Sequence, residues 1–145
     1  MGVAQKMATE LTITSDLAEA RRVQELIEEA LTASAYTEHD VFAIKLALEE
    51  ALVNAIKHGN QMDPDKQVSV VYHVTPVRFD IHITDEGSGF NPEDVPDPTA
   101  PENLERPCGR GLLLMRHYMT EVTFHPPGNR LSMSKVRNGA LPKKG

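Results

Sequence analysis

The spacing of hydrophobic residues changes several times along the chain, and each spacing predicts one kind of element. Residues 9–15 alternate apolar and polar side chains, which is typical of a half-buried strand. Two longer segments repeat apolar residues every three or four positions, which predicts amphipathic helices over about 16–34 and 38–58. Ser15 and Thr37 precede these helices and are candidate N-caps, because their hydroxyl groups can accept a hydrogen bond from the first turn.

The second half of the chain predicts four strands and one short helix. Residues 67–86 contain two strand-like runs with a short break between them, so we expect an antiparallel hairpin. Residues 87–111 are rich in glycine and proline and have no long apolar period, which predicts a long loop. Further apolar runs predict a helix over 112–119 and two strands over 120–126 and 130–136.

The order of these elements favours an α+β fold. We expect a two-layer α/β sandwich with a mixed, mostly antiparallel sheet and the helices on one face. A doubly wound parallel sheet would need a regular alternation of strands and helices, which the pattern lacks. The sequence contains no internal repeat and no linker. We therefore expect residues 1–145 to form a single domain, with a core over about 9–136.

Composition narrows the class of protein. The net charge of −6 argues against nucleic acid as a direct partner. No apolar run approaches the length of a membrane span, and the N-terminus has no hydrophobic region of the kind found in secretory signals. We therefore expect a cytoplasmic protein with no membrane contact. A single cysteine, Cys108, excludes an internal disulfide and a cysteine-based zinc site.

The second predicted helix carries a polar face. At about 100° per residue, Glu50, Asn54 and Lys57 lie together on one side of this helix. The opposite side is apolar and is formed by Val41, Ile44, Leu48, Leu52 and Ala55. Taken alone, such a polar face is more often a solvated surface than a functional site.

Two glycine-containing segments add candidate chemistry. Asp85, Gly87 and Gly89 directly follow a predicted strand, where glycines permit a tight turn and close approach of a ligand. The Asp85 carboxylate could accept a hydrogen bond from an exocyclic amine. The segment GRG, 109–111, opens the next helix, whose free N–H groups and dipole favour an anion.

The order of these motifs resembles the GHKL ATPase superfamily. The glutamate and asparagine of residues 50–54, the DxGxGF segment 85–90 and the GRGLxLM segment beginning at residue 109 occur in the order typical of that superfamily. Within it, the chain resembles the bacterial anti-sigma-factor serine/threonine kinases over about residues 9–136. The resemblance implies an ATP- and Mg²⁺-dependent kinase that acts as an anti-sigma factor. Its substrate would be a STAS-type anti-anti-sigma protein in a partner-switching pathway.

The resemblance also implies a role for each motif residue. Glu50 would be the general base that takes the proton from the substrate hydroxyl, and Asn54 would bind Mg²⁺. Asp85 would hydrogen-bond the adenine amino group, while Gly87 and Gly89 would leave room for the nucleotide.

The second glycine segment would hold the phosphates. Gly109, Arg110 and Gly111 would cradle them, and Arg106 would contact the terminal phosphate. The proline-rich segment 91–107 would be the ATP lid. One departure from the family is the final strand region, PGNRLSMSK, which lacks the usual Gly-Thr pair.

The implied partners are a sigma factor, a STAS-domain protein and a second copy of the chain, with the dimer surface near the first strand and helix. One alternative is a nucleotide-binding regulatory module that binds sigma or STAS partners without phosphoryl transfer. Another is the catalytic domain of a histidine kinase, which is less favoured because only 49 residues precede Glu50. The sequence does not identify the sigma factor, the STAS substrate or the upstream signal.

Overall fold

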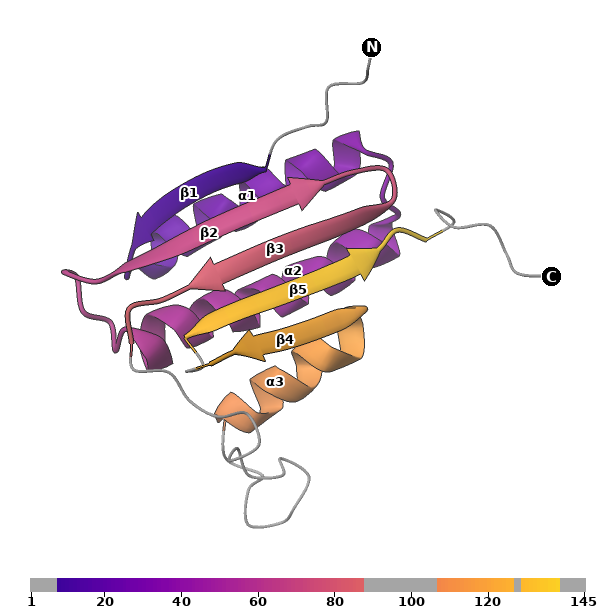
Figure 1. Ribbon diagram of the computed structural model, residues 1–145. Helices are drawn as coiled ribbons and strands as arrows, with labels where there is room; N and C mark the ends of the chain where they lie inside the picture. Colours follow the sequence, from indigo (N-terminus) through magenta and orange to yellow (C-terminus); the bar gives the residue numbers. More distant parts are fainter. Residues whose placement is uncertain (1–7, 88–106, 127–128, 139–145) are drawn as a thin grey trace.

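The computed structural model describes residues 8–87, 107–126 and 129–138 (Figure 1). The elements are β1 (Thr9–Thr14), α1 (Leu17–Ala33), α2 (Glu38–Val53), the π-helix η1 (Asn54–Gly59), β2 (Gln67–Val74), β3 (Arg78–Thr84), α3 (Pro107–Tyr118), β4 (Glu121–His125) and β5 (Arg130–Val136). No helix among the described residues is long and apolar enough to cross a membrane.

The strands form one five-stranded sheet in the order β1-β2-β3-β5-β4. Each pair of neighbouring strands is antiparallel. Figure 1 shows α1 and α2 behind one face of this sheet, with α3 next to β4 at the edge of the sheet. The predicted two-layer α+β fold is therefore confirmed, and the sheet, which we expected to be mixed and mostly antiparallel, is antiparallel throughout the described residues.

The core lies between the sheet and the helical layer. Alternate strand residues point inward, so that Phe79, Ile81 and Ile83 of β3 are buried while His82 is exposed. The fully buried aliphatic residues of α1 and α2 face them: Ile27, Leu31, Ile44, Leu48, Leu52. Each such side chain contributes about 1.5–3 kcal/mol through its removal from water. This core holds α2 firmly, and α2 carries the candidate catalytic residues.

The start of α1 differs from the sequence prediction. Asp16, and not Ser15, is the N-cap, because its carboxylate accepts a hydrogen bond from the N–H of Ala18 at 2.8 Å. Ser15 is buried, and its hydroxyl donates to the carbonyl of Lys66 at 2.8 Å. The predicted cap of α2 is confirmed, since Thr37 Oγ1 accepts from the N–H of Asp40 at 3.0 Å.

The end of α2 contains a feature that the apolar period did not predict. The helical segment continues to residue 59, one residue beyond the predicted end at 58, and its last six residues form the π-helix η1, which begins at Asn54. The N–H of Asn60 donates to the carbonyl of Ala55 at 2.8 Å, which is an i→i+5 bond. π-helical turns are rare in proteins, and those that occur are often found at functional sites.

Helix α3 begins at Pro107, five residues earlier than the predicted start at 112. Proline suits the first position of a helix because its missing N–H has no intrahelical partner there. The segment 109–111 therefore lies in the first turn of α3 and not in a loop. Gly89, Arg106 and the part of the expected lid from 91 to 106 lie outside the described residues.

Candidate functional site

Helix α2 and the π-helix that follows it present two polar residues one turn apart. Glu50 lies in the last part of α2, and Asn54 is the first residue of η1. Both side chains are half-buried, whereas Lys57 and His58 further along are exposed. The burial separates Glu50 and Asn54 from the solvated part of the polar face.

Helix α3 lies beside α2 and runs antiparallel to it (Figure 1). The aromatic ring of Phe42, near the start of α2, meets the ring of Tyr118, at the end of α3, with centroids 6.5 Å apart. The first turn of α3 with its backbone at 109–111 therefore lies on the side of Glu50 and Asn54. The free N–H groups of this turn and the positive end of the helix dipole favour an anion there.

The carboxyl group of Glu50 is harder to ionise than that of an ordinary glutamate. Partial burial raises the pKa of Glu50, and the negative charge of the neighbouring Glu49 raises it further. A carboxylate that is costly to keep ionised binds a proton more readily. This property suits a group that accepts a proton from a substrate.

The turn after β3 packs closely against the end of η1. A Cβ atom on Gly59 would lie 2.4 Å from Cγ of Asp85, and a Cβ atom on Gly87 would lie 2.2 Å from the carbonyl oxygen of Gly59. Both positions therefore require glycine because two backbone segments and a carboxylate share the space. This contact brings Asp85 and Gly87 next to the helix that carries Glu50 and Asn54.

The Asp85 carboxylate is oriented by its own turn. The N–H of Gly87 donates to Asp85 Oδ1 at 2.8 Å. Burial raises the pKa of Asp85, while this N–H donor and the charge of Lys66 act in the opposite direction. The second carboxylate oxygen has no hydrogen bond from the described residues and can accept one from a ligand.

Two asparagines hold this turn, and sequence reasoning assigned a role to neither. Asn60 is fully buried, and its Oδ1 accepts the N–H of Glu86 at 2.8 Å. Asn129 binds the main chain of Asp85 in both directions, at 2.9 Å and 3.0 Å. Asn129 belongs to the region where the Gly-Thr pair of the family is missing. In the sequence, Asn60 is recognisable only as a residue that commonly ends a helix. Nothing in the segment around Asn129 indicates that it binds the turn after β3.

The described site thus joins four of the predicted residues: Glu50, Asn54, Asp85 and Gly87. The backbone of Gly109, Arg110 and Gly111 lies in the adjoining first turn of α3, and the side chain of Arg110 is not described. The arrangement combines a proton acceptor, an amide oxygen and an anion-favouring helix start at one end of the helical layer.

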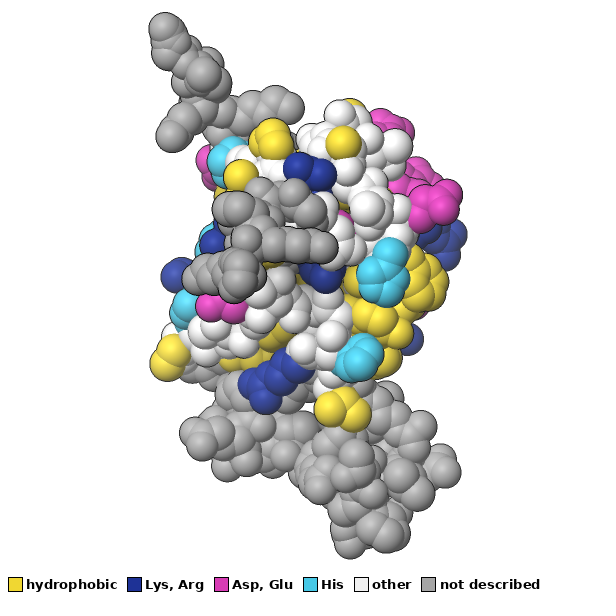
Figure 2. Space-filling view, turned by 90° about the vertical axis from the view of Figure 1, so that its right-hand side faces the viewer, with side chains coloured by type: hydrophobic (Ala, Val, Ile, Leu, Met, Phe, Trp, Pro, Cys, Tyr) yellow, Lys and Arg dark blue, Asp and Glu magenta, His cyan; other side chains and the backbone are white. Residues whose placement is uncertain are grey.

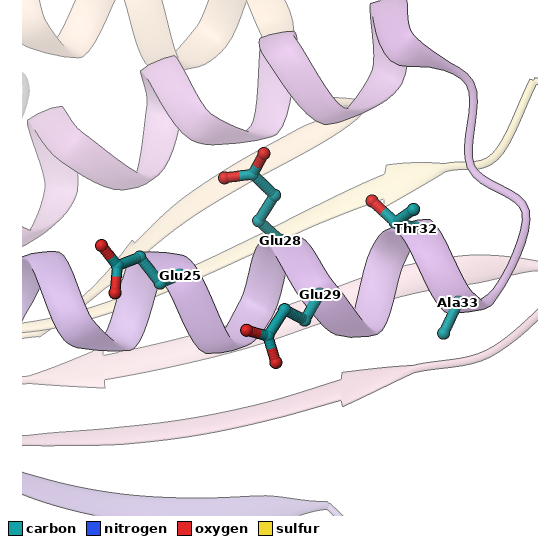
Figure 3. Close-up of a pocket in the computed structure, with 5 residues that line it drawn as sticks. All are labelled: Glu25, Glu28, Glu29, Thr32 and Ala33. Carbon is teal, nitrogen blue, oxygen red and sulfur yellow. The ribbon is translucent and has the colours of Figure 1, made fainter.

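A separate surface hollow lies along α1 and is lined by Glu25, Glu28, Glu29, Thr32 and Ala33 (Figure 3). It includes none of the predicted site residues, and its carboxylates would repel a phosphate. Glu28 also forms an exposed ion pair with Lys45 at 3.3 Å. Figure 2 shows a group of acidic side chains near the top of one flank of the molecule, with basic and then hydrophobic side chains below it. We assign this hollow no role in nucleotide binding.

Comparison with protein families decides the assignment. The model of the histidine kinase-like ATPase domain matches residues 13–135. The chain belongs to this family. The match spans both glycine segments and the helix with Glu50, and it confirms the predicted superfamily.

Relatives within the histidine kinase-like ATPase family include kinases and anti-sigma factors. The chain is 32% identical to serine-protein kinase RsbW of Bacillus licheniformis over 110 residues, which is 71% of this chain and 69% of the relative. It is 38% identical to anti-sigma F factor of Halalkalibacterium halodurans over 90 residues, 59% of this chain and 60% of the relative. These are the relatives that the sequence resemblance implies.

The fold has a counterpart among solved structures. The crystal structure of the RsbU and RsbW domains of Rv1364c from Mycobacterium tuberculosis matches with a TM-score of 0.62 and 16% sequence identity. The match covers 92% of this chain and 33% of that chain. At this identity the likeness establishes the shared fold alone.

Proposed function

We propose that this histidine kinase-like ATPase is a protein serine/threonine kinase that acts in the cytoplasm as an anti-sigma factor. Its substrates are ATP and a STAS-type anti-anti-sigma protein. The observation that carries the proposal is the position of Glu50, a half-buried carboxyl group with a raised pKa, one turn from Asn54 and beside the start of α3. Relatives named as serine-protein kinases support the same activity.

In this proposal ATP spans the site from the β3 turn to α3. The Asp85 carboxylate accepts a hydrogen bond from the adenine amino group, and Gly59 and Gly87 keep the turn close to the helix end. The N–H groups left free at the start of α3, at Cys108 and Gly109, bind the phosphates. The proposed contact between Arg106 and the terminal phosphate concerns a residue outside the described part of the chain.

The residues fit a magnesium ion that is held mainly by its nucleotide. Among the described residues, no group of three or more His, Cys, Asp or Glu side chains could hold a metal by itself. Mg²⁺ commonly takes one or two protein oxygens and completes its shell with phosphate oxygens and water. Asn54 supplies one such amide oxygen. The bound ion would neutralise charge on the phosphates.

Glu50 performs the proton step. The hydroxyl oxygen of the substrate Ser or Thr forms a bond to the terminal phosphorus, and the bond between that phosphorus and the bridging oxygen of ADP breaks. The hydroxyl proton passes to the Glu50 carboxylate. In phosphoryl transfer, most of the rate enhancement comes from positioning the two substrates and from stabilising the charge of the transition state. The general base contributes by accepting the proton of the substrate hydroxyl.

The remaining partners follow from the same proposal. The protein binds a sigma factor when its STAS partner is phosphorylated, and it forms a homodimer near β1 and α1. Among the described residues β1 is an edge strand of the sheet, and one side of its backbone pairs with no other described strand.

The test compares wild type with Glu50→Gln, which keeps the shape of the side chain and removes the proton acceptor. We expect ATP affinity, measured by calorimetry, to stay within about twofold, and phosphate transfer to a STAS-domain protein to fall by at least about 10²-fold. Lys57→Gln, an exposed neighbour, is the control and should transfer at the wild-type rate. Undiminished transfer by Glu50→Gln would show that Glu50 is not the base. A wild type that binds ATP but phosphorylates no STAS-domain protein of its own organism would instead favour the regulatory module.

A further inference from the structure

The buried side chain of Asn60 makes three hydrogen bonds, two donated by Nδ2 and one accepted by Oδ1. Its two Nδ2 hydrogens are donated to Ser15 Oγ and to the carbonyl of Gln67, each at 3.0 Å. Its Oδ1 accepts the N–H of Glu86 at 2.8 Å. A carbonyl only accepts and a backbone N–H only donates, so these two partners fix the orientation of the amide.

These bonds connect segments that are far apart in the sequence. Ser15 lies between β1 and α1, Gln67 begins β2, and Glu86 follows β3. Ser15 in turn donates to the carbonyl of Lys66 at 2.8 Å. Asn60 therefore ties the end of η1 to three other parts of the fold, and one of them is the turn that carries Asp85.

The chain is also strained directly after Asn60. Gln61 and Met62 have φ values of 54° and 60°, in the left-handed region that residues other than glycine rarely adopt. Strained backbone of this kind persists where surrounding contacts fix it, and it often lies at functional sites. The bonds of Asn60 are contacts of this kind.

Residues 59 and 60 act on the Asp85 turn together. Gly59 lies against the Asp85 carboxylate, and Asn60 holds the N–H of the next residue, Glu86. On the other side, Asn129 binds the main chain of Asp85. The position of the Asp85 carboxylate thus depends in part on the hydrogen bond that the Glu86 N–H donates to Asn60, a residue that is itself fully buried.

We infer that Asn60 is a positioning residue that sets the preference of this site for adenine over hypoxanthine. The inference rests on the proposed ATP site and adds a specificity determinant to it. Hypoxanthine carries a carbonyl oxygen where adenine carries its amino group, so a fixed Asp85 carboxylate attracts ATP and repels ITP. Loss of the hydrogen bond between Asn60 and Glu86 lets the turn with Asp85 move. The attraction of ATP and the repulsion of ITP by the Asp85 carboxylate then both weaken.

The experiment measures the affinities of Mg-ATP and Mg-ITP by calorimetry, well below the unfolding temperature of each variant. Asn60→Ala is expected to lower the ratio of ATP to ITP affinity by about tenfold, the usual effect of misplacing one charge-assisted hydrogen bond. The control is Thr37→Ala, which removes the N-cap of α2 and lowers stability without touching the turn. This control should leave the ratio unchanged.

A double-variant comparison separates positioning from a merely structural role. Asp85→Asn alone should lower the ratio, and Asn60→Ala added to Asp85→Asn should lower it no further, because Asn60 acts through Asp85. If Asn60→Ala does not fold, Asn60→Ser takes its place, since it keeps a polar atom in the buried site but shortens the side chain. The same fall in the ratio is expected.

Equal losses of ATP and ITP affinity in the Asn60 variant would overturn the inference and leave the proposed ATP site standing. A further fall in the ratio when Asn60→Ala is added to Asp85→Asn would overturn it too, because Asn60 would then act independently of Asp85. A wild-type protein that binds neither nucleotide would overturn the proposed function, and with it this inference.

Discussion

At the scale of one residue, the surroundings of Glu50 are those we expect of a functional group and not of a structural one. Its carboxyl group is kept partly out of water next to Glu49, and among the described residues no hydrogen bond or ion pair compensates it. A fold selected for stability alone would place a neutral residue here. The raised pKa therefore favours a catalytic role over a solvated surface role.

The cost of keeping the half-buried Glu50 carboxyl group ionised should be measurable as a loss of protein stability at neutral pH. A carboxyl group whose folded pKa is raised contributes stability below its unfolded pKa and loses it as the pH rises through the folded pKa. Glu50→Gln imitates the protonated form, so we expect a higher unfolding temperature than wild type at pH 7. The difference should shrink below about pH 4.5, where wild-type Glu50 is itself protonated.

Calorimetric scans at several pH values measure this effect. Glu25→Gln, an exposed residue of α1, provides the control and should change the unfolding temperature little at any pH. A Glu50→Gln variant that is less stable than wild type at pH 7 would mean that the ionised carboxylate is stabilised by its surroundings.

Several residues of the candidate site could be predicted from the sequence, and there are physical reasons why others could not. Glu50, Asn54 and Asp85 belong to local motifs whose spacing is visible in a single chain. Asn60 and Asn129 act through contacts with residues 26 and 44 positions away. No local pattern distinguishes a buried, bridging asparagine from one that ends a helix or forms a turn.

At the scale of elements, periodicity predicted the strands and helices but not how the ends are formed. Ser15 and Asp16 are both good N-caps, and the contact of Ser15 with Lys66, 51 residues away, decides between them. The early start of α3 was missed because glycine and proline indicate a loop in sequence, although both are compatible with a first helical turn. The π-helix was missed because its apolar residues keep the helical spacing.

The close contact between η1 and the β3 turn gives a test with an unusual sign. At an exposed helix end Gly→Ala commonly stabilises a protein, by up to about 1 kcal/mol. Gly59→Ala should instead destabilise the protein by about 1–3 kcal/mol, because the added Cβ would lie 2.4 Å from Cγ of Asp85. It should also weaken ATP binding, because Asp85 must move.

Urea denaturation and calorimetry measure the two effects of Gly59→Ala. Lys57→Ala, at an exposed position of the same π-helix, should be close to wild type in both. A stabilised Gly59→Ala protein with normal ATP affinity would contradict the close packing of the two segments.

At the scale of the whole molecule, the two ends of α2 have different tasks. Its last turn carries Glu50 of the candidate site, and its first turn is anchored by Asp40, which is fully buried. The Asp40 carboxylate accepts the N–H of Asn138 at 2.9 Å and the Asn138 amide at 3.0 Å, just beyond β5. This anchor joins the start of α2 to the segment that follows β5. The fold class could be predicted from the order of elements, but this pairing across 98 residues could not.

Loss of the anchor should affect stability more than function. Asp40→Ala leaves the N–H of Asn138 without its partner and is expected to cost about 1–3 kcal/mol in unfolding free energy. Asp80→Ala, which removes an exposed ion pair with Arg78, is the matched control and should cost under about 1 kcal/mol. ATP affinity measured in the cold should stay near wild type in both. A large loss of ATP affinity in Asp40→Ala would mean that the two ends of α2 are coupled.

The central claim is that this histidine kinase-like ATPase places phosphate on a serine or threonine of a STAS-type protein. The most direct measurement incubates the wild-type protein with ATP labelled on its terminal phosphate and with purified STAS-domain proteins of its own organism. The acceptor is then tested for acid stability and its modified residue is mapped. Our account predicts acid-stable phosphate on one Ser or Thr of one STAS protein. Acid-labile phosphate on a histidine, or no transfer to any of them, would contradict it.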